Sequence, residues 1–483
     1  MKVLQVSAEI FPLLKTGGLA DIAGALPGAL NAAGCEVRVL LPGFAAILQD
    51  LCDQTVLARM HTPWGDALTL RRGHLRSLGV SAYVLQARAQ FDRGANPYED
   101  AQRRPYADNY RRFAMLGWVA AQLGLGLDAG WQPQVVHAHD WHAALAPAYL
   151  AFAREHQGVR AASVYTVHNL AYQGVFAAHC FTELGLPEAA FAVDGMEYYG
   201  QLSFMKAGLY YADRITTVSP TYAQEIQTPE QGCGLDGLLR ARRSALSGIL
   251  NAVDEAVWNP ATDKLIACAY GAHNPGGKAR CKAALQQEMG LPVQGGAPLF
   301  GLVSRFTEQK GLHLVLAAID ELIERGGQLV ALGSGEAWLE DALREQAARH
   351  PQSVAVCVGY DEDQAHRVFA ASDVTLVPSR FEPCGLTQMY GLKYGSLALV
   401  HRVGGLADTV VDCTLEDLAA QRANGFVFDD FSTEGFSRAL RRAFALYARP
   451  QDWAQVTGRA MQQDYGWKSS AHQYLALYRE VAS

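Results

Sequence analysis

The sequence predicts an α/β protein made of two doubly wound units, each built on a parallel sheet. Short apolar runs alternate with amphipathic helical stretches almost throughout the chain, which is the pattern of helices layered on parallel strands. The chain has 483 residues, too many for one hydrophobic core. Half of the residues are hydrophobic and 18% are charged, as in an ordinary well-packed globular protein.

The first half is expected to contain five core strands. They are residues 2–8, 36–41, 135–138, 163–167 and 214–218. Between the second and third, residues 55–86 are rich in turns and alternation, which predicts antiparallel strands added to the sheet. The first segment, MKVLQVSAEIFPLLK, carries Glu9 and Pro12 and lacks a small-residue cleavage site, so it indicates a strand and not a signal peptide.

The second half is more regular, because each expected strand is followed by a helical stretch, as in a doubly wound sheet. Its strands are residues 299–304, 328–332, 353–358, 374–377 and 397–401. The segment LSGILNAVDEAVWNP, residues 246–260, has the Asn, Asp and Pro content of a loop that crosses between the halves. We therefore expect domains at 1–248 and 249–455, and a terminal segment, 456–483, with a helix that packs back on the first domain.

Charge and cysteine content narrow the class of partner. A net charge of −7 argues against nucleic acid or an anionic membrane as the main partner. No apolar run approaches the ~20 residues that span a bilayer. The nine cysteines include no C-x-x-C pair, so they indicate free thiols in a reducing cytosol and not a zinc or redox site. We expect a cytoplasmic protein.

The pentapeptide GGLAD occurs twice, at residues 17–21 and 404–408. The first copy follows the first strand of its half and the second follows the fifth strand of the other half, so a tandem duplication does not explain the pair. Both copies lie where a strand ends and a helix begins, and paired glycines let backbone N–H groups approach a ligand. A plain tight turn is the alternative. Lys15, just before the first copy, is suited to hold a phosphate.

Two segments of the second half point to phosphate and sugar chemistry. In SRFTEQKG, Arg305 and Lys310 lie five residues apart across a strand-to-helix turn and can clamp a diphosphate, although a surface ion pair would need the same residue types. In PSRFEPCGLTQ, Glu382 and the backbone near Gly385 can bind sugar hydroxyls and phosphate. Cys384 could act as a nucleophile, but no nearby base is indicated.

Two histidine motifs follow strands of the first half. HAHDWH, residues 137–142, could hold a metal through His137 and His139, which share one face of a strand. No companion motif such as H-E-x-x-H occurs, and hydrogen bonding of sugar hydroxyls to Asp140 explains the motif better. His168, in VHNLAYQG, suits either a structural role or a contact to a substrate hydroxyl. We expect no metal.

In this order, KTGGLAD, HAHDWH, VHNLAYQG, SRFTEQKG, PSRFEPCGLTQ and GGLADTV resemble the starch/glycogen synthase family of retaining glucosyltransferases. The resemblance spans nearly the whole chain. It implies two Rossmann-like domains facing across a deep cleft, the glycosyltransferase-B architecture, with the acceptor on the first domain and the nucleotide-sugar donor on the second. It also implies transfer of glucose from ADP-glucose to the non-reducing end of an α-1,4-glucan such as glycogen, with no metal or cofactor.

The same resemblance assigns roles to individual residues. The catalytic set is His168, Arg305, Lys310 and Glu382. The donor-binding set is Lys15, Gly17, Gly18, Cys384, Gly385 and Leu386. The acceptor and cleft set is Asp21, Asp140 and Asn169. Many relatives of this fold carry a Glu where this chain has Tyr390, which leaves the usual ribose contact open.

Other functions remain as alternatives. UDP-glucose could replace ADP-glucose as donor. A non-catalytic glucan-binding relative is expected to lack one of Lys15, Arg305, Lys310 and Glu382, all of which are present. A glucan phosphorylase needs a lysine motif for pyridoxal phosphate, which we do not find, and a sugar-nucleotide epimerase would lack KTGGLAD and GGLADTV. The sequence offers no identifiable carboxylate pair for a double displacement, which favours front-face displacement.

Overall fold

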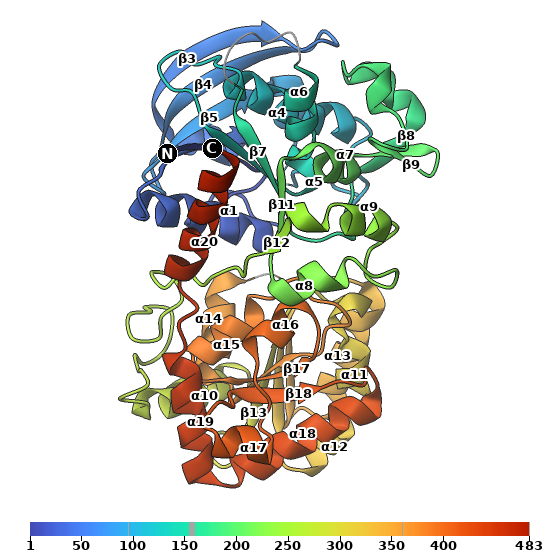
Figure 1. The fold of residues 1–483 in the computed structure, drawn as a ribbon. Helices are drawn as coiled ribbons and strands as arrows, with labels where there is room; N and C mark the ends of the chain where they lie inside the picture. The colour runs from blue at the N-terminus through green and yellow to red at the C-terminus, as the bar shows by residue number, and fades with distance from the viewer. Residues whose placement is uncertain (95, 154–159, 360, 483) are drawn as a thin grey trace. The chain divides into compact units, whose positions relative to one another are not determined.

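The computed structural model describes residues 1–94, 96–153, 160–359 and 361–482 (Figure 1). The chain forms two compact units, of which the first contains Met1–Asn251 and Trp467–Ser483 and the second contains Ala252–Gly466. Each unit has the α/β layering expected from the sequence. Within the described residues, no helix combines the length and the apolar content needed to span a bilayer.

The first unit is built on a sheet that has nine strands within the described residues. In spatial order the strands are β12 (Leu246–Gly248), β11 (Arg214–Thr217), β7 (Ala162–Val167), β6 (Val135–His139), β1 (Lys2–Val6), β2 (Glu36–Pro42), β5 (Val80–Gln86), β4 (Ala67–Leu75) and β3 (Leu51–His61). The strands from β12 to β5 are parallel neighbours, whereas β4 and β3 are antiparallel additions.

The prediction of antiparallel strands in residues 55–86 is therefore confirmed for β3 and β4, and it is confirmed for β5 only in its pairing with β4. Strand β5 pairs in parallel with β2 on one side and antiparallel with β4 on the other. Its sequence, VSAYVLQ, is buried at most positions, as expected for a strand of the parallel core that has both faces covered. The expected crossing loop also begins with a strand, because residues 246–248 form β12 and pair with β11.

Helices connect the parallel strands of the first unit, since parallel pairing requires a crossover connection. They are α1 (Gly18–Ala32), α2 (Ala45–Asp50), α3 (Arg88–Phe91), α4 (Asn109–Gly124), α5 (Asp140–Ala143), α6 (Leu145–Phe152), α7 (Phe204–Tyr211), α8 (Pro220–Glu225) and α9 (Asp236–Ala241), with short 3-10 turns at Ala178–Glu183, Glu188–Ala190 and Arg243–Ala245. A small antiparallel sheet contains β8 (Val175–Ala177), β10 (Gln201–Ser203) and β9 (Glu197–Tyr198).

The last helix, α20 (Trp467–Val481), returns to the first unit (Figure 1). It packs against α1 and β7, and the Tyr478 hydroxyl lies 2.7 Å from Nδ1 of His137. Residues 456–466, which the sequence-based division joined to this terminal segment, lie in the second unit. The reason is that α19 (Pro450–Gln462) packs against α15 (Thr387–Lys393) and α18 (Thr433–Tyr447) of that unit. Ser483, the final residue of the predicted segment, lies outside the described residues.

The second unit has a sheet of six parallel strands within the described residues. In spatial order they are β15 (Val354–Val358), β14 (Gln328–Gly333), β13 (Leu299–Val303), β16 (Val374–Val377), β17 (Leu397–His401) and β18 (Gly425–Phe428). This is the 3-2-1-4-5-6 order of doubly wound Rossmann sheets. The five expected strands are present, whereas β18 was not predicted, because GFVF is short and begins with a glycine.

The helices of the second unit alternate with these strands. They are α10 (Gly276–Glu288), α11 (Leu312–Ala317), α12 (Ile319–Glu324), α13 (Ala337–Arg349), α14 (Glu362–Ala371), α15 (Thr387–Lys393), α16 (Gly404–Thr409), α17 (Leu415–Ala419), α18 (Thr433–Tyr447) and α19, with a 3-10 turn at Glu308–Lys310.

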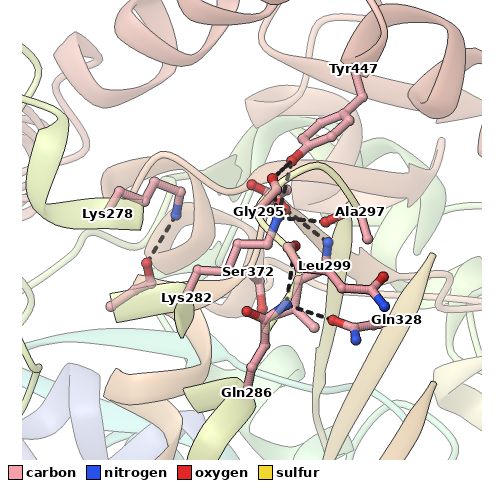
Figure 2. Close-up of polar contacts among 12 residues, drawn as sticks. Lys278, Lys282, Gln286, Gly295, Ala297, Leu299, Gln328, Ser372 and Tyr447 are labelled. Carbon is pink, nitrogen blue, oxygen red and sulfur yellow. Dashed lines mark hydrogen bonds and ion pairs between the residues drawn. The ribbon is translucent and has the colours of Figure 1, made fainter. Parts of the chain in front are cut away.

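Helix α10 is anchored to the amino ends of the strands by polar side chains (Figure 2). Lys282 is buried, and its Nζ lies 2.6 Å from Oδ2 of Asp373, the residue before β16. The same carboxylate accepts the backbone N–H of Leu299 at the start of β13, at 2.8 Å. One turn further along α10, Gln286 donates to the side chain of Gln328 at the start of β14, at 2.6 Å. These contacts fix three strands of the sheet at the edge opposite their carboxyl ends.

The strand order reverses once in the parallel part of each sheet. In the second unit, the chain leaves β13 toward β14 on one side and leaves β16 toward β17 on the other. In the first unit, the chain leaves β1 toward β2 and β6 toward β7 in opposite directions. Open α/β sheets bind ligands beyond the carboxyl ends of the strands at such reversals. We therefore expect ligand-binding residues directly after β1, β6, β13 and β16.

Candidate active site

The loop after β1 contains the first glycine motif. Nζ of Lys15 donates to Oδ1 of Asp21 at 2.9 Å, and both side chains are mostly buried. Helix α1 begins at Gly18, with Gly17 as its N-terminal cap residue. A Cβ atom built on Gly17 would meet no other atom within 4 Å, so the structure leaves open space in front of this backbone. Two residues predicted for the site, Lys15 and Asp21, are thus brought together.

Asp140 follows β6 at the reversal point of the first sheet. It has a left-handed backbone with φ of 57°, and its Oδ1 accepts the backbone N–H of Trp141 at 2.9 Å. Only 7% of the residue is exposed. Because burial disfavours the carboxylate, the pKa of Asp140 is raised to about 8. The side chain therefore carries a proton at neutral pH and can donate a hydrogen bond as well as accept one.

His168 follows β7, the next strand of the first sheet. Its Nε2 lies 3.0 Å from Nδ1 of His139. Burial lowers the pKa of His168 to about 3, so the imidazole is neutral and can serve as a hydrogen-bond partner without carrying charge. Asn169 accepts the backbone N–H of Ala171 at 3.0 Å and therefore shapes the turn that follows His168.

The remaining histidines of HAHDWH are packed into the first unit. His137 lies within hydrogen-bond distance of the Tyr478 hydroxyl and, at 2.6 Å, of the Thr166 hydroxyl. His142 is buried and stacks on Tyr98 at 4.6 Å between ring centroids. Among the described residues, no group of three or more His, Cys, Asp or Glu side chains is arranged to hold a metal ion.

In the second unit, Lys310 and Glu382 meet at the reversal point between β13 and β16. Nζ of Lys310 lies 2.6 Å from Oε2 of Glu382, and the same oxygen accepts the Ser379 hydroxyl at 2.8 Å. Glu382 is 7% exposed. Arg305 lies on the same loop as Lys310 and is exposed. Two residues predicted for catalysis are thus in direct contact, in a charge-assisted hydrogen bond.

The turn after Glu382 presents its backbone through an unusual conformation. Gly385 has φ of +74°, a value that favours glycine. The Nε2 amide group of Gln388 donates hydrogen bonds to the carbonyl oxygens of Cys384 and Gly385, at 3.0 and 2.8 Å. Within the described residues, the amides of Gly385 and Leu386 make no backbone hydrogen bond as donors. Cys384 itself is buried, with 4% of the residue exposed.

The second glycine motif serves the packing of this turn. A Cβ atom on Gly404 would lie 2.0 Å from the carbonyl oxygen of Glu382, and one on Gly405 would lie 2.1 Å from that of Cys384. The amide of Gly405 already donates to the carbonyl groups of Glu382 and Pro383, each at 3.2 Å. The expectation that both glycine pairs offer backbone N–H groups to a ligand is therefore wrong for Gly405. Position 405 requires glycine because α16 packs closely against the turn after Glu382, which leaves no room for a Cβ atom.

Two residues had roles that sequence motifs did not reveal. Glu9 accepts hydrogen bonds from Thr16 of the first glycine loop, and no motif of the sequence predicted this contact. Tyr390, at the position where many relatives carry Glu, is buried and stacks on Trp258 at 3.9 Å between ring centroids. Partners as distant in sequence as Tyr390 and Trp258 leave no signal in residue spacing.

Comparison with known proteins places these loops in a family. Residues 2–241 match the family described as starch synthase catalytic domain, and residues 287–457 match glycosyl transferases group 1. The chain is 63% identical to a glycogen synthase of Variovorax paradoxus, with 100% of this chain and 99% of that protein covered. It is 60% identical to a glycogen synthase of Leptothrix cholodnii, with 100% of both covered.

Solved structures agree with the fold. The catalytic domain of starch synthase IV from Arabidopsis thaliana, bound to ADP and acarbose, is 33% identical and superposes with a TM-score of 0.89 over 99% of both chains. A sucrose-phosphate synthase from Thermosynechococcus elongatus is 16% identical, with a TM-score of 0.59 over 99% of this chain and 98% of that one, and it supports the fold alone.

Proposed function

Because the chain belongs to the starch and glycogen synthase family, we propose that it uses ADP-glucose as donor and an α-1,4-glucan as acceptor. The chain is a glucosyltransferase of glycogen synthesis, with the glycosyltransferase-B architecture expected from the resemblance. The adenine nucleotide is supported by the ADP bound to the plant starch synthase. We place the reaction in the cytoplasm, with neither membrane nor nucleic acid as a partner.

The Lys310–Glu382 pair carries the proposal. An ammonium 2.6 Å from a nearly buried carboxylate is held in one place before any ligand arrives, and preorganised charge is the main electrostatic source of catalysis. When the donor binds, Glu382 is suited to accept glucose hydroxyl groups. Lys310 and Arg305 are suited to bind the diphosphate, because its negative charge grows as the bond to glucose breaks.

The proposed chemistry is a front-face displacement. The bond between glucose C1 and the phosphate oxygen breaks, and the acceptor hydroxyl oxygen forms the new bond to C1 on the same face. The departing phosphate oxygen takes the proton of that hydroxyl, so no protein base is required and the anomeric configuration is retained. Neutral His168 is suited to contact the glucose 6-hydroxyl by hydrogen bonding.

The remaining predicted residues bind and orient the two substrates. In the donor set, we propose that Lys15 exchanges its contact with Asp21 for a phosphate of the donor, with the open backbone at Gly17 and the neighbouring Gly18 beside it. The backbone of Cys384, Gly385 and Leu386 belongs to the same set.

The acceptor set is Asp21, Asp140 and Asn169. A protonated carboxyl at Asp140 can both donate to and accept from a glucan hydroxyl.

Arg305→Ala and Lys310→Ala test these roles. Each is expected to lower kcat for glucose transfer from ADP-glucose to glycogen by roughly 10²-fold or more, with a smaller change in the KM for glucan, because the lost charge acts mainly in the transition state. Arg344→Ala is the control, since Arg344 forms exposed ion pairs in the same unit. The assignment is wrong if either variant raises only the KM for glucan.

A further inference from the structure

The carboxylate of Glu9 holds the first glycine loop at a single residue. Glu9 lies three residues after β1 and is 3% exposed. Its two oxygens accept the backbone N–H and the hydroxyl of Thr16, each at 2.5 Å. The Tyr98 hydroxyl donates to the same carboxylate. A carboxylate this deeply buried is costly unless donors surround it, and these donors include both polar groups that Thr16 can offer.

The position of Thr16 makes this contact relevant to the site. Thr16 lies between Lys15 and Gly17 in the sequence. Hydrogen bonds that hold both its backbone and its side chain therefore also restrict the backbone orientation of these two neighbours. The rest of the loop is closed by its own backbone, with Ile10 and Leu14 exchanging hydrogen bonds at 3.1 and 2.9 Å. Glu9 therefore joins the start of this closed loop to Thr16, and the Lys15–Asp21 pair adds a contact between the loop and α1.

The third donor connects this loop to the histidine motif. The Tyr98 ring stacks on His142 at 4.6 Å between ring centroids. Burial, together with the charge of Glu9, raises the pKa of Tyr98 well above its usual value, so its hydroxyl keeps its proton and remains a donor. The glycine loop and the HAHDWH segment thus share one buried carboxylate as a common support.

We propose that Glu9 is a positioning residue that orients Lys15 and the Gly17 backbone for the donor by clamping Thr16. The inference rests on the proposed function, since it assumes that this loop binds ADP-glucose. In Glu9→Gln, one carboxylate oxygen becomes an NH₂ group that cannot accept, so one of the two Thr16 donors is left without its acceptor. We expect roughly a tenfold rise in the KM for ADP-glucose and in the Kd for ADP, with the KM for glucan unchanged.

The chain offers a matched control for a purely structural carboxylate. Asp213 accepts the backbone N–H and the hydroxyl of Ser163 at 2.7 and 2.8 Å, which is the same clamp at the amino end of β11 and β7. Asp213→Asn is expected to lower the Tm while leaving the KM for ADP-glucose unchanged. Thr16→Ser, which keeps both donors, should retain most of the wild-type donor affinity. Thr16→Val, which loses the hydroxyl, should reproduce the effect of Glu9→Gln.

Two readouts separate the inference from the proposed function. Hydrogen–deuterium exchange of residues 10–18 in the free protein should be faster in Glu9→Gln than in the wild type and unchanged in Asp213→Asn. Glu9→Gln should raise the donor KM less in the Lys15→Ala background than in the wild type, because only the Gly17 backbone then remains to be oriented. A Glu9→Gln protein with unchanged loop exchange and unchanged donor KM would overturn the positioning role. A wild-type protein that neither binds ADP nor uses ADP-glucose would instead refute the proposed function.

Discussion

At the scale of single residues, the site depends on how burial sets the charge of each polar group. Lys310 and Glu382 form a charge-assisted pair at 2.6 Å, whereas burial raises the pKa of Asp140 to about 8. Burial also disfavours the charged form of His168 and lowers its pKa to about 3, so this imidazole is neutral. Lys310 and Glu382 of the second unit are therefore charged, whereas Asp140 and His168 of the first unit are neutral.

Asp140 predicts a pH dependence of stability. The folded state binds the Asp140 proton up to about pH 8, whereas an unfolded chain releases it near its ordinary pKa of about 4. The stabilisation that the neutral carboxyl provides is therefore complete below about pH 4 and is lost as the pH rises toward about 8. Asp140→Asn keeps a neutral side chain, so its Tm should fall less than that of the wild type between about pH 5 and about pH 8. Parallel Tm curves for the two proteins would contradict the raised pKa.

The sequence predicted candidate site residues that lie within motifs. It did not predict the residues outside the motifs that hold them in place. Arg305, Lys310 and Glu382 were selected because cations and carboxylates at strand ends suit phosphate and sugar, and the structure does bring Lys310 and Glu382 into contact. The Glu9–Thr16 clamp was not predicted, because a single glutamate after a strand has no distinctive spacing. Catalytic and binding roles for the whole set stay predictions until variants are measured.

At the scale of elements, the two copies of GGLAD have different physical requirements. Both begin a helix after a strand and a loop, α1 after β1 and α16 after β17. Gly17 faces open space, whereas Gly404 and Gly405 lie within 2.0–2.1 Å, measured from a built Cβ, of backbone carbonyl oxygens. A shared five-residue string therefore predicted a shared strand–loop–helix context correctly, but it could not distinguish backbone left open for a ligand from backbone packed against a turn.

Alanine substitutions separate these requirements. Gly405→Ala should lower the Tm and also reduce kcat, because its Cβ would press on the carbonyl of Cys384 and displace the turn that carries Glu382. Gly17→Ala should leave the Tm close to that of the wild type while raising the KM for ADP-glucose. Thermal unfolding and steady-state kinetics on the two variants would check this. Equal losses of Tm in both would show that the two loops are under the same packing constraint.

The polar anchoring of α10 predicts a large stability effect far from the site. Burial disfavours the Lys282 ammonium, but the charge of Asp373 and hydrogen bonds to its neighbours outweigh this and raise the pKa of Lys282. Lys282→Met would leave Asp373 as an uncompensated buried charge, so we expect a loss of about 3–5 kcal/mol in the free energy of unfolding. Arg344→Ala, at an exposed pair, should lose less than about 1 kcal/mol. Denaturant titration that gave similar small losses for both would contradict the anchoring role.

The strand predictions were incomplete for β18, which is short, and for β5, whose pairing depends on the strands on both sides of it. The segment GFVF forms β18 because it pairs with β17 along its whole length, a contact that four residues cannot signal by periodicity. Residues 80–86 pair in parallel with β2 on one side, although they pair antiparallel with β4, the strand that precedes them in sequence. Pairing partners are set by the sheet as a whole, and local patterns indicate only that a strand exists.

At the scale of the whole molecule, each unit places its candidate residues at the reversal point of its own sheet. Lys15 lies in the loop after β1 and Asp140 directly follows β6 at the start of α5, whereas Lys310 and Glu382 lie in the segments after β13 and β16. The fold class was predictable from alternation of strands and helices, and the agreement with a starch synthase over 99% of both chains confirms it.

The central claim is that the chain transfers glucose from ADP-glucose to a glucan by a route that needs no metal. The most direct test is transfer of label from ADP-[¹⁴C]glucose and from UDP-[¹⁴C]glucose to glycogen, each with excess chelator present. We predict faster incorporation from ADP-glucose, no loss with chelator, and complete release of the added label by an enzyme specific for α-1,4 linkages. Incorporation only from UDP-glucose, or activity that chelator abolishes and added Mg²⁺ restores, would contradict the account.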